Sequence, residues 1–243
     1  MKYNIIITAG GTSEKIDNVR KITNSRSGKL GQIIAMKLIE LHEDDIDTIY
    51  YVCSKNSYKP VHKKVKIVEI TDTEHLKNSI VELLTKTKID YFIHSMAVSD
   101  YKVQYVTTVE KMSDTIKHNL DKDINEIINN HENNLVENKI SSNENNLIIK
   151  LTKTPKIISL IKNLSPKTYL VGFKLLDNVS KNVLLETAVK LKEKNKCDIV
   201  VANDLNTIRK GTHEAFIIKS KNDYITAMGK DDIAYKLIGE IMR

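Results

Sequence analysis

The sequence of 243 residues contains no tryptophan and only three phenylalanines, three prolines, eight glycines and two cysteines. So little proline and glycine excludes collagen-like repeats and extended disorder. Cys53 and Cys197 are too few for a disulfide framework and fit no metal-ligand spacing, which predicts a reducing, cytoplasmic setting. No apolar run approaches the roughly 20 residues that a membrane span needs, and the N-terminal apolar stretch is too short for a signal peptide. We therefore expect no membrane partner.

Arginine is also scarce: only four of the 38 basic residues are arginines, although the net charge is +7. Such a charge invites an interpretation as a nucleic-acid-binding protein, but the sequence has few aromatic residues and no recognised nucleic-acid motif. The abundance of Lys, Asn and Ile is typical of an AT-rich genome, and it favours a lysine-coated, solvated surface. The alternative is a site for small anions such as phosphates, where a few of these charges gather.

Strands and helices alternate along the sequence. The first predicted strand, residues 4–8 (NIIIT), ends in a glycine turn, and an amphipathic helix is predicted over residues 28–42. Further strands are predicted over 48–53, 65–70, 90–94, 147–151, 169–173, 198–202 and 215–219, and further helices over 73–85, 183–194 and 230–242. Thr154 is predicted to cap one more helix, with Pro155 at its first position. This alternation predicts an α/β fold of the Rossmann-like, doubly wound type: a mostly parallel sheet with helices on both faces.

The alternation lapses between residues 119 and 146, which include ten asparagines and neither glycine nor proline. A short helix is predicted around residues 124–128, and the remainder reads as a loop or flap. With no linker and no internal repeat, we expect a single domain over residues 1–243 that carries a flap or lid insertion at about 101–146.

Ligands of open α/β sheets bind outside the carboxyl ends of the strands, so the polar segments there are the candidate sites. The turn at Gly10 and Gly11 can bring the backbone close to a phosphate, or it is a purely structural turn. Ser27 and Gly28 open a helix, where the dipole favours an anion, or they form an ordinary helix start.

Four more residues have two interpretations each. Asp100 could hold Mg²⁺ beside a triphosphate or cap a turn. His94, at a strand end, is expected to be a packed histidine in preference to a base. Lys190 and Lys194 share one helix face, which is either a solvated stripe or a phosphate contact.

Taken together, these segments resemble one family. Residues 7–35, ITAGGTSEKIDNVRKITNSRSGKLGQIIA, closely resemble the N-terminal signature of phosphopantothenate–cysteine ligases. Later segments agree in order: AVSDY (97–101), KISS (139–142), KTPKII (153–158), VGFK (171–174) and VAND (201–204). The resemblance spans nearly the whole chain. It is greatest to the stand-alone bacterial form, because the chain starts at the ligase signature without a decarboxylase domain ahead of it.

The resemblance implies a ligase that joins 4′-phosphopantothenate to cysteine in coenzyme A synthesis. Bacterial members use CTP with Mg²⁺, and eukaryotic relatives prefer ATP. The substrate carboxylate attacks the α-phosphorus, which releases pyrophosphate and forms an acyl-cytidylate, and the cysteine amine then displaces CMP. The expected partners are these small molecules, a second copy in a homodimer, and a separate decarboxylase that acts next.

The resemblance also assigns residues. Asn24 is expected to stabilise the oxyanion, Lys139 to close over the triphosphate, and Arg20 to hold a phosphate or organise its loop. Nucleotide-binding positions are Gly10, Gly11, Ser27, Gly28, His94, Ser95, Met96, Asp100, Pro155, Lys156, Ile157, Ile158, Phe173, Lys190 and Lys194. Substrate-binding positions are Asn24, Ala97 and Asn203, and Asp100 is the expected metal ligand. Two departures stand out: the family usually has alanine at Met96, and Arg26 replaces a serine.

The alternative from another class is a nicotinamide-dependent Rossmann oxidoreductase. Its discriminating GxGxxG motif is missing after the first strand.

Overall fold

The structure is a computed structural model that describes residues 2–131 and 139–242. Its contacts divide the chain into two compact units. Residues 1–12, 25–98 and 156–243 form the first, which we call the sheet unit, and residues 13–24 and 99–155 form the second, the ribbon unit. The ribbon unit therefore includes the predicted insertion at 101–146, but it also takes in residues 13–24 and 147–155.

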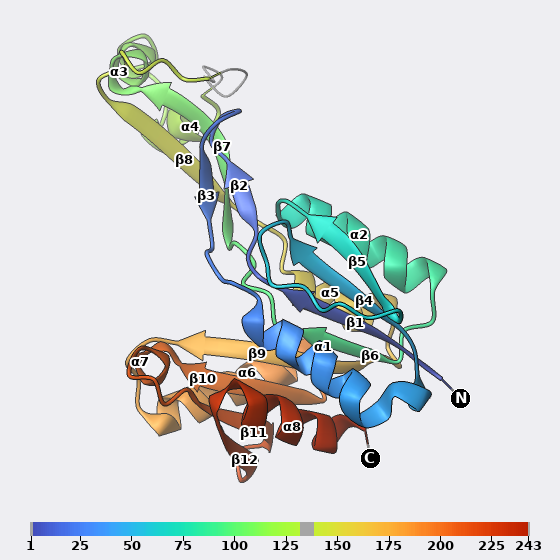
Figure 1. The fold of residues 1–243 in the computed structure, drawn as a ribbon. Helices are drawn as coiled ribbons and strands as arrows, with labels where there is room; N and C mark the ends of the chain where they lie inside the picture. The colour runs from blue at the N-terminus through green and yellow to red at the C-terminus, as the bar shows by residue number, and fades with distance from the viewer. Residues whose placement is uncertain (1, 132–138, 243) are drawn as a thin grey trace. The chain divides into compact units, whose positions relative to one another are not determined.

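The sheet unit is built on one eight-stranded sheet (Figure 1). Its strands are β1 (Tyr3–Ala9), β4 (Ile46–Ser54), β5 (Val65–Ile70), β6 (Tyr91–His94), β9 (Tyr169–Leu176), β10 (Ile199–Asp204), β11 (Glu214–Ser220) and β12 (Asp223–Met228). The spatial order is β12-β11-β10-β9-β6-β1-β4-β5; the six strands from β10 to β5 are parallel, and β11 is antiparallel to both of its neighbours, β10 and β12. Those six follow the doubly wound order, so the prediction of a mostly parallel, Rossmann-like sheet is confirmed.

Helices cover both faces of this sheet, as predicted. Figure 1 shows α1 (Lys29–His42) and α8 (Gly229–Ile241) on one face, and α2 (Thr73–Lys86), α5 (Ile157–Leu164) and α6 (Lys181–Asn195) pack on the other. Two short helices, η1 (Glu43–Asp45) and α7 (Leu205–Arg209), complete the unit. In β1, Ile5 and Ile7 belong to the α1–α8 core and Ile6 to the opposite core, all fully buried. A strand buried on both faces is apolar throughout, which explains the run NIIIT.

The ribbon unit contains two small antiparallel sheets. They are formed by β2 (Ser13–Lys15) with β3 (Lys21–Thr23), and by β7 (Tyr101–Thr108) with β8 (Leu147–Lys153). Two helices, α3 (Val109–Lys117) and α4 (Ile124–Asn129), follow β7 in the chain, and the Tyr105 hydroxyl donates a hydrogen bond of 2.8 Å to the Ile128 carbonyl. The short helix expected near residues 124–128 is thus present as α4.

Three local expectations need correction. The strand at 147–151 exists as β8, but it pairs with β7 outside the main sheet. The predicted insertion also contains β7 and α3, which the sequence did not indicate, while residues 132–138 of the predicted lid lie outside the described residues. Thr154 does not cap α5, which begins at Ile157 with Lys156 as its N-cap. The buried Thr154 hydroxyl instead donates to the Ser99 carbonyl, because both belong to the ribbon unit.

Candidate functional site

The strand order reverses between β1 and β6, since the chain continues from β1 to β4 on one side and reaches β6 on the other. Crevices at such switch points are the usual ligand sites of doubly wound sheets. Beyond the strands, Ala97 N donates to Gly10 O at 2.8 Å, Thr12 N donates to Ala97 O at 3.3 Å, and Gly11 bridges to Ala97. The structure therefore brings Gly10, Gly11 and Ala97 together at one strand-end edge.

The two predicted glycine segments also meet there. Gly10 has φ +83° and Gly28 has φ +73°, a backbone region that favours glycine. A Cβ atom placed on Gly28 would lie 3.0 Å from Gly10 N, and one on Gly10 would lie 2.0 Å from Ser57 Oγ. The N-terminus of α1 is thus packed against the turn after β1. A helix N-terminus beside a glycine turn favours an anion such as a phosphate.

The close packing at Gly10 predicts how a methyl group added there changes the stability of the protein. Gly10→Ala should lower the free energy of unfolding by about 1–3 kcal/mol, because it adds backbone strain and a clash with Ser57. Gly239, inside α8, has open space at its Cβ position, so Gly239→Ala should raise that free energy by up to about 1 kcal/mol. Urea denaturation of both variants measures the difference. Equal changes in the free energy of unfolding for the two variants would contradict the close packing at Gly10.

His94 ends β6 and is buried, with a 2.8 Å hydrogen bond between its Nδ1 and Thr8 Oγ1. Burial lowers its pKa to about 4, so the ring is neutral at pH 7 and does not titrate near neutrality. Ser95 Oγ donates to the Thr8 carbonyl at 2.7 Å, and Met96 is buried in the core beneath this edge. His94 therefore agrees with the packed histidine expected from the sequence, and its contact with a nucleotide stays a prediction.

The buried histidine should make stability fall in acid. With a pKa of about 4 in the folded protein and 6.5 otherwise, the unfolded chain binds more protons between these values. The free energy of unfolding should therefore fall by about 3 kcal/mol as the pH drops through this window, and be fully restored above pH 6.5. Urea denaturation at pH 7 and pH 4 should show a smaller loss for His94→Gln than for the unchanged protein. The control His118→Gln, at an exposed position, should keep the full loss.

Strands β9 and β10 supply two more of the predicted positions, and the first residue of α5 supplies a third. Phe173 is partly buried against the α1–α8 core and pairs with Val201. Asn203 is buried at the end of β10, and its Nδ2 donates to His213 Nε2 at 3.2 Å. Ile157 is 2% exposed, so its side chain belongs to the core and only its backbone is available to a ligand.

Ile158 and Lys156 frame the start of α5. A Cβ atom on Gly172, which pairs with His94, would lie 3.2 Å from Ile158 Cδ1. The side chain of Ile158 thus packs on β9, while Lys156 is exposed. The start of α5 therefore lies close to the ends of β6 and β9.

The structure does not bring Lys190 and Lys194 to this edge. Helix α6 connects two parallel strands, β9 and β10, so it runs antiparallel to both, and the two exposed lysines lie in its last two turns. The chain then leads to Asp198, whose carboxylate accepts a hydrogen bond of 2.7 Å from Leu170 N at the start of β9. Both lysines therefore lie toward the amino ends of the strands, as a solvated stripe.

In the ribbon unit, Asp17, a residue outside the predicted set, contacts the predicted Arg20 and the backbone next to the predicted Lys139. The Asp17 carboxylate accepts hydrogen bonds from the N–H groups of Val19 and Arg20 at 2.7 Å each, and from Ile140 N at 3.2 Å. The Arg20 guanidinium lies 3.4 Å away. These hydrogen bonds lower the pKa of Asp17, whose side chain is fully buried. The sequence signal that could have identified Asp17 was its position between Ile16 and Arg20 in the N-terminal signature.

The other predicted residues of the ribbon unit lie at its surface. Asn24, Asp100 and Lys139 are exposed, and Pro155 is half-buried. Asp100 accepts a hydrogen bond from Thr154 N through its carbonyl, which joins the two chain segments that enter and leave the β7–β8 sheet. Their expected contacts with a nucleotide stay predictions.

Magnesium was expected at Asp100. Among residues 2–131 and 139–242, no group of three or more His, Cys, Asp or Glu side chains could hold a metal ion. Mg²⁺ is usually bound through one or two carboxylates together with substrate phosphates, and Asp100 presents one exposed carboxylate. The residues therefore fit a magnesium ion that arrives with a triphosphate, and they do not fit one held by the protein alone.

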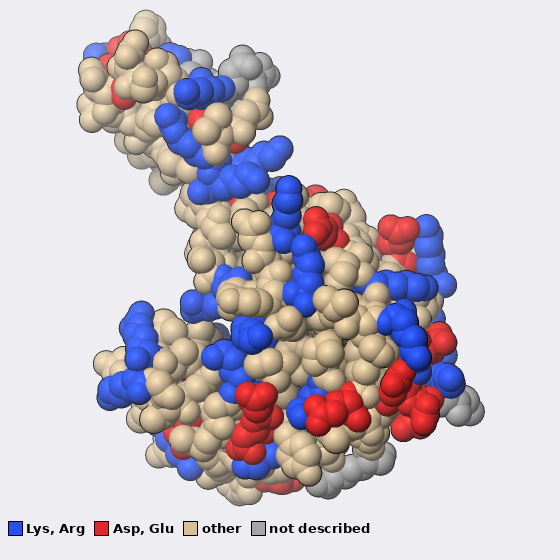
Figure 2. Space-filling model, viewed as in Figure 1, with Lys and Arg blue, Asp and Glu red and all other residues tan. Residues whose placement is uncertain are grey.

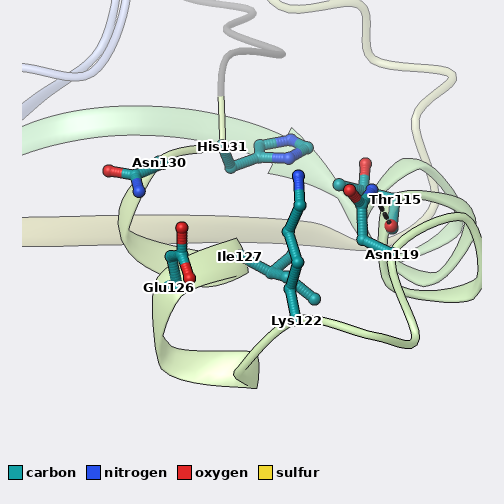
Figure 3. A pocket seen from close by; sticks show the side chains of 7 residues that line it. All are labelled: Thr115, Asn119, Lys122, Glu126, Ile127, Asn130 and His131. Carbon is teal, nitrogen blue, oxygen red and sulfur yellow. Dashed lines mark hydrogen bonds between the residues drawn. The ribbon is translucent and has the colours of Figure 1, made fainter.

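A hollow of about 560 Å³ lies in the ribbon unit beside α3 and α4 (Figure 3). It is lined by Thr115, Asn119, Lys122, Glu126, Ile127, Asn130 and His131. His131 is buried, with its Nε2 3.0 Å from Thr107 Oγ1. None of the predicted site residues lines this hollow.

Acidic side chains lie among the basic ones on the face of the sheet unit shown in Figure 2. Ion pairs join Lys59 to Glu69 at 2.5 Å and Lys77 to Glu74 at 3.0 Å. This mixture is typical of the solvated surface that the composition favoured. In the part of the chain that the structure describes, no helix is long and apolar enough to cross a membrane.

Comparison with known proteins identifies relatives along the whole chain. The family model described as the DNA/pantothenate metabolism flavoprotein C-terminal domain matches residues 1–134 and 106–243. The "Coenzyme A biosynthesis bifunctional protein CoaBC" of Thermococcus kodakarensis is 30% identical over 240 residues, which are 98% of this chain and 50% of that protein. "Phosphopantothenate--cysteine ligase 1" of Arabidopsis thaliana is 39% identical over 74 residues, 30% of this chain and 23% of the plant protein.

Among solved structures, the crystal structure of the DNA/pantothenate metabolism flavoprotein from Streptococcus pneumoniae has a TM-score of 0.84 and 35% identity. The match covers 100% of this chain and 99% of that one. The chain spans about half the length of the first curated relatives that it matches.

Proposed function

Because this chain belongs to the DNA/pantothenate metabolism flavoprotein C-terminal domain family, we propose that it catalyses the phosphopantothenate–cysteine ligase step of coenzyme A biosynthesis. The observation that carries the proposal is the likeness to a CoaBC protein over 98% of the chain. The match to a plant phosphopantothenate–cysteine ligase supports the same activity. The product would pass to a decarboxylase, as the resemblance implies.

The proposed reaction has two steps. A carboxylate oxygen of 4′-phosphopantothenate forms a bond to the α-phosphorus of CTP, and pyrophosphate leaves. The cysteine amine then forms a bond to the acyl carbon and loses a proton as CMP leaves. A carboxylate needs this activation because its own oxygen is a poor leaving group. The protein's contribution is to position the reactants and to screen negative charge.

The proposal assigns roles to residues of each unit. In the sheet unit, backbone N–H groups of the Gly10–Gly11 turn and of the α1 N-terminus would donate hydrogen bonds to phosphate oxygens, since both segments lie at the switch point. In the ribbon unit, Lys139 would contact the triphosphate and Asn24 would stabilise the oxyanion during attack by the amine. Asp100 would hold Mg²⁺, which screens the charge of the triphosphate when bound.

The contact with Asp17 bears on the two roles left open for Arg20. Its guanidinium lies 3.4 Å from a buried carboxylate, and its backbone carbonyl accepts the N–H of Ile16 at 2.9 Å. Both contacts stay within the turn between β2 and β3. They support the loop-organising role over a direct phosphate contact.

A homodimer is part of the proposal. Leu147, Ile149 and Leu151 alternate along β8 and are each about 40% exposed, which leaves an apolar row on a two-stranded sheet. An isolated two-stranded sheet is only marginally stable, and its open edges pair readily with another chain. A second copy of the chain would cover this row. Sedimentation equilibrium should give a mass twice that of the 27.7 kDa chain.

The oxidoreductase alternative shares the doubly wound sheet but not the local connection. In nicotinamide-binding proteins the glycine turn after the first strand leads directly into a helix. Here β2 and β3, which belong to the ribbon unit, lie between β1 and α1. The structure therefore does not favour this alternative.

The deciding experiment measures pyrophosphate. Purified full-length protein with CTP, Mg²⁺, 4′-phosphopantothenate and cysteine should release it, and mass spectrometry should detect 4′-phosphopantothenoylcysteine. Parallel reactions with ATP decide the nucleotide preference. Absence of pyrophosphate and product with both nucleotides would refute the ligase.

A further inference from the structure

A buried charge in the ribbon unit joins two segments of the chain that are far apart in sequence. The side chain of Asp17 is fully buried, and a carboxylate in such a position is costly unless hydrogen bonds compensate it. Three backbone N–H groups and the Arg20 guanidinium supply that compensation. Two of the N–H groups, from Val19 and Arg20, belong to the turn that connects β2 to β3.

The third N–H group comes from Ile140, which is 123 positions away in sequence. Ile140 is 3% exposed, whereas its neighbour Lys139 is exposed. The backbone is therefore fixed one residue after Lys139 by a charge-assisted hydrogen bond, while the Lys139 ammonium group stays at the surface. This arrangement holds the backbone beside Lys139 in place while the Lys139 side chain stays flexible.

We propose that Asp17 is a positioning residue that fixes the backbone beside Lys139 and orders the Arg20 turn at the same time. It acts through these two residues and does not itself contact a substrate. The role of Lys139 rests on the proposed function, whereas the hydrogen bond between Asp17 and Ile140 is independent of it. Removing the carboxylate should release the Lys139 segment while leaving β7 and β8 in place.

The first test is hydrogen–deuterium exchange on the full chain. Asp17→Asn replaces one acceptor oxygen with an NH₂ group that faces N–H donors, so exchange at Ile140 should become faster, by about 10-fold or more. The matched control is Asp123→Asn, because the Asp123 carboxylate likewise accepts backbone N–H bonds in the ribbon unit, two in its case, but caps α4. It should leave exchange at Ile140 unchanged. Unchanged exchange at Ile140 in Asp17→Asn overturns the proposal, and so does faster exchange throughout β7 and β8, which would make Asp17 a general stabiliser.

The second test uses turnover. Asp17→Asn should lower kcat for nucleotide-dependent pyrophosphate release by about 10- to 100-fold with KM for cysteine little changed, since a misplaced catalytic group costs rate more than binding. Ile140→Pro removes the N–H donor without touching Asp17 or Arg20, and should lower kcat more than Ile140→Ala, which keeps the donor. Equal effects of the two Ile140 variants would overturn the proposal. If the unchanged protein has no ligase activity, the proposed function fails, and the exchange experiment still decides the role of Asp17 as an anchor.

Discussion

Lys139→Gln should slow formation of the acyl-nucleotide intermediate by about 100- to 1000-fold, because it removes a cation from the point where negative charge develops on the triphosphate. The side chain is exposed, so the substitution should leave the free energy of unfolding within about 0.5 kcal/mol of its original value. Rapid-quench measurement of pyrophosphate in a single turnover reports this step directly. Urea denaturation checks that the fold is intact.

A matched control is available in the same unit. Lys102 is also exposed, on β7, and Lys102→Gln removes the same charge from the ribbon unit. It should retain intermediate formation within about twofold, as expected for a surface substitution. An unchanged rate in Lys139→Gln would move the catalytic role to another cation. Equal losses of rate in both variants would show that net charge, and not the position of Lys139, causes the effect.

Asn24→Ala should have an effect of similar size on the other half of the reaction. Loss of one donor to an oxyanion costs about 100- to 1000-fold in kcat, so formation of the amide should slow by that factor. Activation of the carboxylate does not use this donor. The acyl-cytidylate should therefore accumulate, and mass spectrometry of the quenched reaction should detect it together with a normal first burst of pyrophosphate.

The contrast between the two variants is the decisive result, since Lys139→Gln should form little intermediate and Asn24→Ala should retain it. Asn222→Ala, at an exposed turn between β11 and β12, is the control for loss of a surface amide and should behave as the unchanged protein. If Asn24→Ala forms no intermediate, the residue acts in the first step and the assigned oxyanion role is wrong.

Most of the main sheet could be predicted from the sequence because its central strands are buried on both faces and are therefore largely apolar. The run at residues 5–7 and the strand β10 are of this kind, and both were located. Strands β2, β3, β7 and β12 were not, since they are short or largely polar at one end. β8 was found as a strand but its separate sheet was not, because its partner β7 lies some 40 residues earlier and gave no signal of its own.

The parts of the candidate site that could be predicted are those whose position follows from the direction of the strands alone. The segments at Gly10 and Ala97 follow parallel neighbouring strands, so they must meet at one edge. Lys190 and Lys194 were associated with that edge by motif alone, and the direction of α6 places them at the opposite edge. The contacts of Ser57 with Gly10 and of Asp17 with Ile140 could not be predicted, because each depends on how separate loops pack.

The division of the ribbon unit between two stretches of chain has a consequence for biosynthesis. A ribosome adding roughly 5–20 residues per second needs about 6–25 seconds to extend the chain by the 123 positions that separate Asp17 from Ile140. For most of that interval the β2–β3 hairpin has emerged without β7, and throughout it the Asp17 carboxylate lacks the N–H group of Ile140. A nascent chain therefore exposes this hairpin to proteases and chaperones for seconds, while β1 and β4 can already pair.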